Sequence, residues 1–521
     1  MFACGGIKWF KSKRSKFDDK ELEQIWPPYG SEIIFTEAGK RLLQKSAYVQ
    51  KPDISDIDVE GLIEQSLRFP IKFGRDTCRV MSQPKERYQE IEKQIASAYP
   101  IIHERVVGLY LAFLEHKCKY GNEQERAIYA DMTITGLVQR LLEKRCVAFV
   151  GPLDDYMLLK GRKTLANFFD VGTIDEKPPL LLKDVLSYDE IKLSAFLSVS
   201  SHSEFLNNGR RFNCGIIEED KSKIEIEGVI IGIIGGRFEA EDVMEWQDIM
   251  ITPMQNTKER GYGHKAQSAK KTKNPKVDYR QLWIRFYEEQ DLLYDKVEYI
   301  NSPRFFKDEK TRYIFDNLLM KKRYAITFDT LLLEADARGK ATDKQVYLHV
   351  VGIGLGAWRA VQHQDKIFLK TFKERIQTLL LCLTHISVVH FSNFRPSAAK
   401  DFITDGDKIV SKDHPNGGIE TLVHDRYPAQ KLPPEYEKLL IVQSYAWDAN
   451  ALPGNEFWKG ALTSSGDPAA ACSTLIAELH NPHINRKMVN GENLHVASER
   501  YGVLHISEYA KQILALSGFS C

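Results

Sequence analysis

Acidic and amide side chains are concentrated in one loop, Asp448–Trp458 (DANALPGNEFW). Asp448 and Glu456 lie eight residues apart, and Asn450 and Asn455 lie near them. Positioned carboxylates can act as general acids, as general bases or as partners of a positive charge. The aromatic residues beside them would restrict water, which strengthens each polar contact. We therefore predict a functional site in this loop.

Asp467 is a third candidate carboxylate, in the segment Ser464–Ala469 (SSGDPA) that follows this loop. Aspartate before proline is also typical of a helix start, with aspartate as N-cap and proline at the first helical position. The sequence leaves both roles open for Asp467, and one residue can fill both.

Three glycines alternate in a second loop, Val351–Trp358 (VGIGLGAW), at positions Gly352, Gly354 and Gly356. Such glycines let backbone N–H groups approach an anion, and the positive end of a following helix adds to the attraction. The pattern is neither the G-x-G-x-x-G of a Rossmann loop nor the G-K-S/T of a P-loop. Phosphate binding and tight strand–helix packing are equal alternatives for the loop. Trp358 is either a core residue or a surface on which a sugar or base stacks.

Helices and strands alternate around both loops. The predicted strands and helices are Tyr324–Arg338 (a helix capped by Gly339), Val346–Val351 (strand), Asp365–Cys382 (helix), Ile386–Phe391 (strand), Leu439–Tyr445 (strand) and Pro468–Leu479 (helix). Strands separated by helices predict an α/β fold with a mostly parallel sheet covered by helices. Ligands bind at the carboxyl ends of such strands, which is where both loops begin.

The first half of the chain has a more helical pattern. We expect helices over 85–150 that end in the strand CVAFVG, followed by a polar turn at SSHSEFLNNGRR. A strand is expected at Lys223–Gly236, with Trp246–Thr252 as its partner. In the second half, Ser392–Pro434 is expected to be a surface loop. The basic stretch 256–280 is expected to be a loop or linker, with an arm that contacts an anionic partner as the alternative. We therefore predict an N-terminal segment 1–64 of open order, a helical or α+β part 65–255, the linker 256–280 and a catalytic part 281–521.

Composition excludes several protein classes. The 521 residues include 72 Lys and Arg against 71 Asp and Glu, a net charge of +1, so a nucleic-acid partner is not expected. The apolar runs are too short to span a bilayer, so no membrane partner is expected. The eight cysteines form no CxxC pair, which favours a reducing compartment, the cytoplasm, and leaves the nucleus open. No cluster has metal-ligand spacing, so we expect metal-independent chemistry.

Two segments resemble macrodomains, especially poly(ADP-ribose) glycohydrolase. The succession of GIGLGAW, a long helix and the strand VVHFSNF is similar to the second phosphate loop of that family. DANALPGNEFW is similar to the other signature loop, in which an Asn precedes a glycine turn under the ADP-ribose. The two loops come in the opposite order here, so the resemblance implies a macrodomain-like fold with permuted connectivity.

A more extensive resemblance is to the MavL-like macrodomain hydrolases, a bacterial effector and its eukaryotic relatives. EKPPLLLKDVLSYDEIKLSAFLSVSSHSEFLNNG and GVIIGIIGGRFEAEDVMEWQDIMI also resemble that family, so the likeness extends from about residue 65 onward. The resemblance implies removal of single ADP-ribose groups from arginine side chains of proteins, ubiquitin included. It implies Asp448, Glu456 and Asp467 as the catalytic acidic residues, with Glu456 standing where the family is expected to have Asp.

The residues agree with that chemistry. Cleaving the bond between ribose and guanidinium passes through oxocarbenium-like charge, so carboxylates can stabilise it, activate water or hold the guanidinium. Which of Asp448 and Glu456 does which stays open. ADP-ribose is then a ligand and product, and no cofactor is expected. The predicted substrate contacts are Asn450, Asn455, Gly352, Gly354, Gly356, Trp358, Phe457, Asn393 and the adenine candidates Phe328 and Asp329.

Two other functions are kept as alternatives. The first is a module that binds ADP-ribose without cutting it. The second is an NAD-dependent ADP-ribosyltransferase built on residues 198–251, where Glu239-Ala240-Glu241 forms a Glu-x-Glu pattern. So short a pattern is common by chance and no clear Arg strand precedes it, so we expect this segment to be structural.

Overall fold

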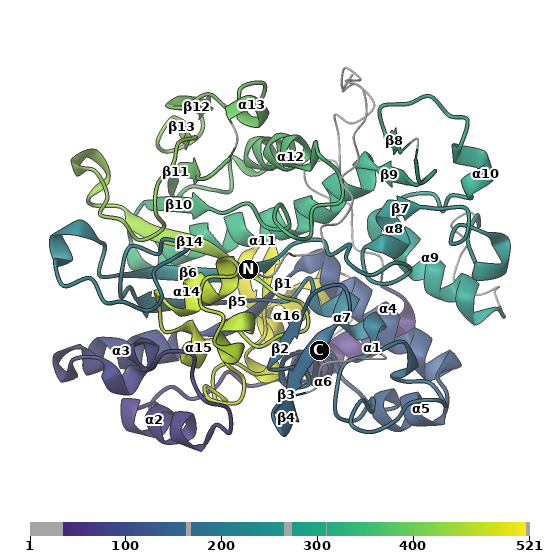
Figure 1. Cartoon of the computed structure of the whole chain (residues 1–521), viewed down its shortest axis with the longest axis horizontal. Helices are drawn as coiled ribbons and strands as arrows, with labels where there is room; N and C mark the ends of the chain where they lie inside the picture. The colour runs from purple at the N-terminus through teal and green to yellow at the C-terminus, as the bar shows by residue number, and fades with distance from the viewer. Residues whose placement is uncertain (1–34, 163–167, 265–272, 309, 395, 517–521) are drawn as a thin grey trace.

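A ten-stranded sheet runs through the centre of the computed structural model, which describes residues 35–162, 168–264, 273–308, 310–394 and 396–516 (Figure 1). The strand order is β12-β13-β11-β10-β14-β6-β5-β1-β15-β16. The strands are β1 (Tyr99–His103), β5 (Ser198–Glu204), β6 (Glu227–Ile234), β10 (Val346–Val350), β11 (Ile386–Phe391), β12 (Asp407–Val410), β13 (Gly418–Leu422), β14 (Leu440–Trp447), β15 (His495–Ser498) and β16 (Gly502–His505).

Neighbouring strands β13, β11, β10, β14 and β6 all run parallel. Strand β5 is antiparallel to both β6 and β1, while β1 and β15 are again parallel. Short antiparallel strands β12 and β16 end the sheet on the two sides. The expected mostly parallel α/β sheet is therefore confirmed. The apolar run of β6 fits its place between two strands, because such a strand is covered on both faces.

Helices pack on both sides of this sheet, and α11 lies along several of its strands, including β1, β6 and β10 (Figure 1). The helices are α1 (Glu37–Ser46), α2 (Val59–Arg68), α3 (Tyr88–Ala96), α4 (Glu104–Tyr120), α5 (Glu123–Tyr129), α6 (Ile134–Glu143), α7 (Tyr188–Ser194), α8 (Trp246–Ile249), α9 (Pro275–Tyr287), α10 (Tyr294–Val297), α11 (Asn317–Thr342), α12 (Gln364–Leu379), α13 (Pro396–Ala399), α14 (Gly466–Ala471), α15 (Ile476–Leu479) and α16 (Ile506–Leu516). Two smaller sheets contain β2 (Ala148–Val150), β3 (Asp155–Leu158) and β4 (Gly161–Arg162), and β7 (Met250–Ile251), β9 (Ile314–Asp316) and β8 (Phe305–Lys307).

Helix α11 is longer at both ends than its periodic pattern predicts. The Asp316 side chain caps its first turn by accepting from two backbone N–H groups, and Asp343 ends it in the left-handed conformation. Gly339 therefore lies inside the helix and does not cap it. A Cβ at Gly339 would lie 2.7 Å from Val346 and 2.8 Å from the Lys344 carbonyl, so glycine is needed there for close packing.

Two further predictions in the first half of the chain are wrong. Residues 200–204 of the predicted turn 200–211 belong to strand β5, because pairing with β1 and β6 on its two sides satisfies the backbone of this polar strand. Trp246–Thr252 does not pair with β6. It forms the short helix α8 and the strand β7, which pairs with β9 in a separate sheet. A partly apolar run of this length fits a helix or a strand equally well, and only tertiary pairing decides.

The central sheet takes strands from both sides of the basic stretch 256–280. Residues 265–272 of that stretch, and 1–34 of the N-terminal segment, lie outside the described residues. The excursion 392–434 is not wholly irregular, because it contributes β12 and β13 to the sheet. The segment 198–251 supplies β5 and β6, so much of it is part of the scaffold. No described helix combines the length and apolarity needed to cross a membrane.

Candidate active site

Three loops leave the same edge of the sheet, because β6, β14 and β10 are neighbouring parallel strands. Trp447 at the end of β14 is paired with Ile234 at the end of β6. The loops that follow are Gly235–Glu239 after β6, Asp448–Trp458 after β14 and Val351–Trp358 after β10. Residues far apart in the sequence thus meet at the carboxyl ends of adjacent strands.

Asp448 is buried and held in one orientation at this edge. The Asn450 backbone N–H donates to one carboxylate oxygen at 3.3 Å, and the Asn455 amide donates to the other at 3.1 Å. Burial raises the pKa of Asp448 to about 7; Arg237 opposes the rise, while Glu239 and Glu456 add to it. Asp448 can therefore exchange a proton near neutral pH.

Glu456 and Asp467 place two more carboxylates beside it. Glu456 lies on the 3₁₀ helix η9 (Asn455–Lys459) and accepts from the Ser465 hydroxyl at 3.1 Å. One Asp467 oxygen accepts from the Gly454 N–H at 2.7 Å, and the other is buried without a described hydrogen-bond partner. Burial raises the pKa of Glu456, and it raises that of Asp467 well above the ordinary range with Glu456 as the next cause. Asp467 thus ties α14 to the glycine turn and also carries a free acceptor.

The two asparagines are deeply buried and reach strand β2. Asn455 accepts from the Phe149 N–H at 2.8 Å and donates to the Phe149 carbonyl at 3.0 Å, in addition to its bond with Asp448. Its amide therefore positions the carboxylate. The Asn450 amide nitrogen lies 3.7 Å from the Cys146 sulfur, and its amide oxygen is buried without a described partner. That oxygen is a buried acceptor that no described group satisfies.

The aromatic residues of the loop form its apolar support. Phe457 is fully buried and packs edge-on against Phe73 at 6.3 Å, while Trp458 packs against Phe73 at 5.0 Å and Phe69 at 5.1 Å. Phe457 is therefore placed in the core and does not face the ligand side. These rings keep water from the back of the acidic loop, as the sequence suggests, through partners from the segment before α3 that the sequence did not indicate.

The glycine loop lies against the loop that follows β6. A Cβ at Gly235 would lie 2.7 Å from the Gly354 nitrogen and 2.8 Å from its Cα, and Gly354 has a positive φ of 67°. Trp358 is half-buried at the end of the loop. Asn393 follows β11, the next strand, and is exposed with a φ of 62°. Helix α12 begins only at Gln364, so it does not follow the glycines directly.

Gly235→Ala is expected to lower substrate affinity at least ten-fold. The added methyl would meet backbone atoms of Gly354, which cannot move aside as a flexible side chain can, so the two loops must separate. Titration with ADP-ribose by calorimetry checks this. Gly136→Ala is the matched control, because Gly136 also has no positive φ and an added Cβ there would meet only side-chain atoms, at 3.3 Å or more. Unchanged ADP-ribose binding by Gly235→Ala would contradict the close contact.

Phe328 and Asp329 do not join this site. Both lie on α11 with no exposed surface, and Phe328 packs among Tyr324, Phe368 and Phe372. Asp329 makes two hydrogen bonds to Arg375, at 2.6 and 2.8 Å. Their burial in the core leaves no route to an adenine ring from their present positions.

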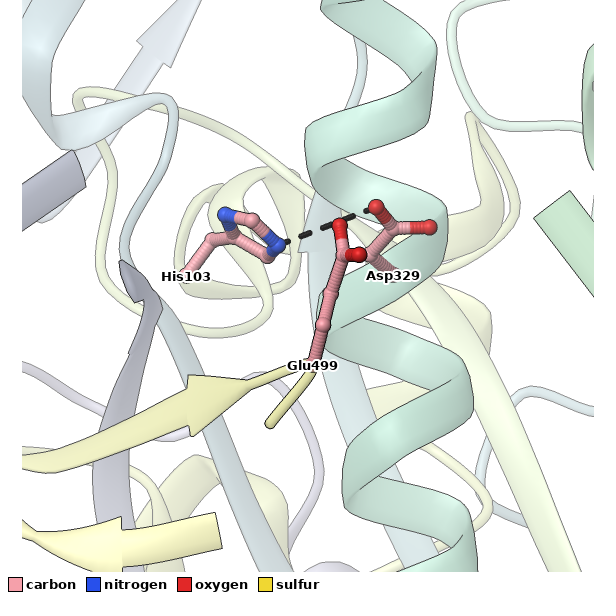
Figure 2. A group of neighbouring side chains, drawn as sticks. All are labelled: His103, Asp329 and Glu499. Carbon is pink, nitrogen blue, oxygen red and sulfur yellow. Dashed lines mark ion pairs between the residues drawn. The ribbon is translucent and has the colours of Figure 1, made fainter. Parts of the chain in front are cut away.

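Asp329 belongs to a separate buried group with His103 and Glu499 (Figure 2). The three offer ligand atoms within 4.8 Å of one another, and the His103 Nε2 lies 3.7 Å from Asp329. Arg375 already binds both carboxylates, with Glu499 at 3.1 Å. The guanidinium therefore already pairs with the charges of both carboxylates, and Arg375, Asp329 and Glu499 form an ion-pair network.

Arg237 and Glu239 lie beside the acidic loop. They come from the segment 198–251, which we expected to be structural. Arg237 Nε donates to Glu239 at 3.0 Å, and the two charges act on Asp448 in opposite directions. Arg145, from the chain before β2, stacks on Trp447 at 4.0 Å and is a second cation near Asp448 and Asp467. One signal was present in the sequence: Gly235 and Gly236 directly follow the apolar run of β6, so glycine follows a buried strand in all three loops.

Comparison with known proteins agrees with this geometry. Residues 60–512 match the family model described as "ADP-ribosylhydrolase MavL-like". Two Drosophila melanogaster proteins are similar over nearly their whole length. "ADP-ribosylarginine hydrolase CG2909" is 48% identical over 496 residues, covering 95% of this chain and 97% of the fly protein. "ADP-ribosylarginine hydrolase CG3568" is 51% identical over 492 residues, covering 94% and 95% respectively.

The family match spans most of the chain, and it includes all three loops at the edge of the sheet. Both relatives are well above the identity at which a common fold and a common family are expected. The resemblance recognised in the sequence is thereby confirmed, and the chain belongs to the MavL-like ADP-ribosylhydrolase family.

Proposed function

We propose that this chain removes mono-ADP-ribose from arginine side chains of proteins by hydrolysing the bond between the ribose anomeric carbon and a guanidinium nitrogen. The observation that carries this is the group of three carboxylates, the buried Asp448 and Asp467 and the half-buried Glu456, at the edge of the sheet beside the glycine loop. The printed names of the two fly relatives support the same activity.

The reaction suits carboxylates because positive charge develops on the ribose. As the bond to nitrogen breaks, the electron pair leaves with a neutral guanidine and the ribose becomes oxocarbenium-like. Water attacks the anomeric carbon and gives its proton to a carboxylate, and that proton then passes to the guanidine. Because the guanidinium of the modified arginine is already positively charged at neutral pH, it leaves as a neutral guanidine and needs no separate acid. The products are ADP-ribose and an unmodified arginine.

Each part of the site has a place in this scheme. Asp448 is the base, because its pKa is close to neutral and two hydrogen bonds fix its orientation. Glu456 and the free oxygen of Asp467 stabilise the positive ribose. The unpartnered Asn450 oxygen accepts a hydrogen bond from a ribose hydroxyl. The backbone N–H groups of Gly352, Gly354 and Gly356 face the diphosphate, while those of Ile353 and Leu355 donate to carbonyls within the loop.

The rate is expected to depend on pH through Asp448. Its ionised form takes the proton from water, so kcat/KM should rise as pH increases toward about 7 and level off above it. Arg237 and Arg145 act against protonation of this carboxylate, and Glu239, Glu456 and Asp467 act in favour of it. Initial rates between pH 5 and 9 measure the profile. A rate that falls as pH rises through 7 would show that Asp448 acts as an acid.

We further propose that the hydrolysis needs no metal ion and that ubiquitin carrying ADP-ribose on arginine is one substrate. Asp448, Asp467 and Asn455 of this site are hydrogen-bonded to protein groups, and Asp329 of the separate group is paired with Arg375. Dialysis against EDTA is expected to leave the rate unchanged. Loss of activity that Mg²⁺ or Mn²⁺ restores would overturn metal independence.

The test of the function compares two synthetic peptides, one with ADP-ribose on arginine and one with ADP-ribose on serine. Release of free ADP-ribose is measured by chromatography, with binding of ADP-ribose measured in parallel. Release from the arginine peptide alone is the expected result. Binding of ADP-ribose without release from either peptide would leave a binding module, and consumption of NAD that persists in Asp448→Asn would point to a transferase.

A further inference from the structure

Glu239 lies at the edge of the sheet that carries the acidic site, on the loop that follows β6. One of its oxygens accepts from Arg237 Nε at 3.0 Å, and among the described residues its other oxygen has no hydrogen bond. Arg237 makes two further hydrogen bonds, to the Gly151 carbonyl at 2.9 Å and to Asp154 at 2.8 Å. Arg237 therefore anchors Glu239 without covering both of its oxygens.

A continuous set of contacts joins Glu239 to Asp448. The Arg237 guanidinium lies 4.8 Å from the centre of the Phe149 ring, and Phe149 forms two backbone hydrogen bonds with Asn455. Asn455 in turn donates to Asp448. The two carboxylates are thus joined by one set of packed and hydrogen-bonded groups. Their charges interact as well, since Glu239 raises the pKa of both Asp448 and Glu456.

The site holds more acidic than basic groups. Glu239, Asp448, Glu456 and Asp467 are opposed by Arg237 and Arg145. The pKa values of Asp448, Glu456 and Asp467 are raised, because burial and neighbouring negative charges disfavour their ionised forms. A cation that enters such a site is stabilised, and an uncharged linkage is not. The guanidinium is the group that distinguishes arginine-linked ADP-ribose from the serine- or glutamate-linked forms, and it prefers a carboxylate partner.

We propose that the free oxygen of Glu239 accepts a hydrogen bond from the guanidinium of the modified arginine, which makes Glu239 the residue that selects arginine. The inference rests on the proposed function and assigns a task to a carboxylate outside the acidic loop. If Glu239 holds the guanidinium, Asp448 does not need to pair with it and can act as the base that activates water.

Glu239→Gln tests this with little structural change, because the amide oxygen can still accept from Arg237. We expect KM for the arginine-modified peptide to rise about ten- to a hundred-fold, the effect of losing one charge-assisted hydrogen bond, with kcat changed far less. Inhibition by L-arginine methyl ester should weaken by a similar factor. Inhibition by free ADP-ribose should be unchanged or stronger, because a negative charge has been removed from the site.

Glu241→Gln is the matched control, because Glu241 is an exposed carboxylate two residues further along the same loop. It should behave as the wild type in every assay. Equal inhibition of the wild type and Glu239→Gln by the arginine ester, or a loss of kcat at unchanged KM, would overturn the inference. Failure of the proposed function is distinguishable, because the wild type itself would then release no ADP-ribose.

The pH profile separates a direct role from a purely structural one. Without the charge of Glu239, the pKa of Asp448 should fall, so the rising limb of kcat/KM should move to lower pH. The other charged groups that affect the pKa of Asp448 are unchanged in Glu239→Gln. They are Arg237, Arg145, Glu456 and Asp467. If kcat/KM of Glu239→Gln rose over the same pH range as that of the wild type, the placement of Glu239 in the site would be contradicted.

Discussion

Asp448→Asn is expected to lower kcat for release of ADP-ribose from an arginine-modified peptide by about 100- to 10,000-fold, the usual effect of removing a positioned base. The asparagine keeps one oxygen as an acceptor for the Asn450 N–H or the Asn455 amide, so the loop should keep its shape. Ionisation of the buried carboxylate is unfavourable in the folded state, so the variant should be no less stable at pH 8. Single-turnover rates and thermal unfolding measure the two effects.

The controls separate chemistry from binding. ADP-ribose should bind Asp448→Asn within a few-fold of the wild type, since the diphosphate and most of the nucleotide lie away from this side chain in the proposed arrangement. Glu241→Gln, which removes an exposed carboxylate near the site, should retain full activity. A variant that keeps more than a tenth of the wild-type rate would exclude Asp448 as the base and direct attention to Glu456 and Asp467.

Arg375→Met is expected to reduce the free energy of unfolding by about 3–5 kcal/mol, because it leaves the buried charge of Asp329 without its partner. Arg375 also binds Glu499, which lies next to β15, so the change loosens the contact between α11, α12 and the end of the sheet. Urea unfolding followed by circular dichroism measures the loss (Figure 2 shows the partners Asp329 and Glu499).

Two variants make this result specific. Arg68→Met breaks an exposed pair with Glu64 and should cost less than about 1 kcal/mol. The double variant Arg375→Met with Asp329→Leu should recover much of the loss, because it removes both charges. If Arg375→Met cost no more than Arg68→Met, the group at Asp329 would not hold the fold together and its role as an ion-pair network would be wrong.

Local sequence patterns predict much of the fold. Strand β11 has the predicted bounds Ile386–Phe391, and β10 and β14 differ from prediction by a few residues. These strands are apolar runs bounded by loops, and helices separate them, so their type and parallel direction follow from periodicity. Helix α11 was recognised, but its true ends depend on the caps at Asp316 and Asp343. End positions depend on single hydrogen bonds, which a hydrophobic pattern does not contain.

Strand β5 shows where such patterns fail. Its residues, Ser198–Glu204, are mostly polar and look like a turn, yet the strand pairs with β1 and β6 near the middle of the sheet. Its side chains find partners that lie far away in the chain. Ser201, for example, hydrogen-bonds His480 at 2.9 Å. Burial of a polar strand is favourable only when such partners are present, and their presence is a property of the tertiary structure.

The sequence by itself determined the acidic loop after β14, the glycine loop after β10 and the family to which the chain belongs, since each depends on a local run of residues. Only the tertiary structure decided how the site is completed. It places Phe457, Phe328 and Asp329 in the core, and it brings Glu239 close enough to Asp448 to raise the pKa of that carboxyl. The physical reason is that adjacent parallel strands unite loops from distant parts of the chain, and that burial sets the pKa of the carboxylates that meet there.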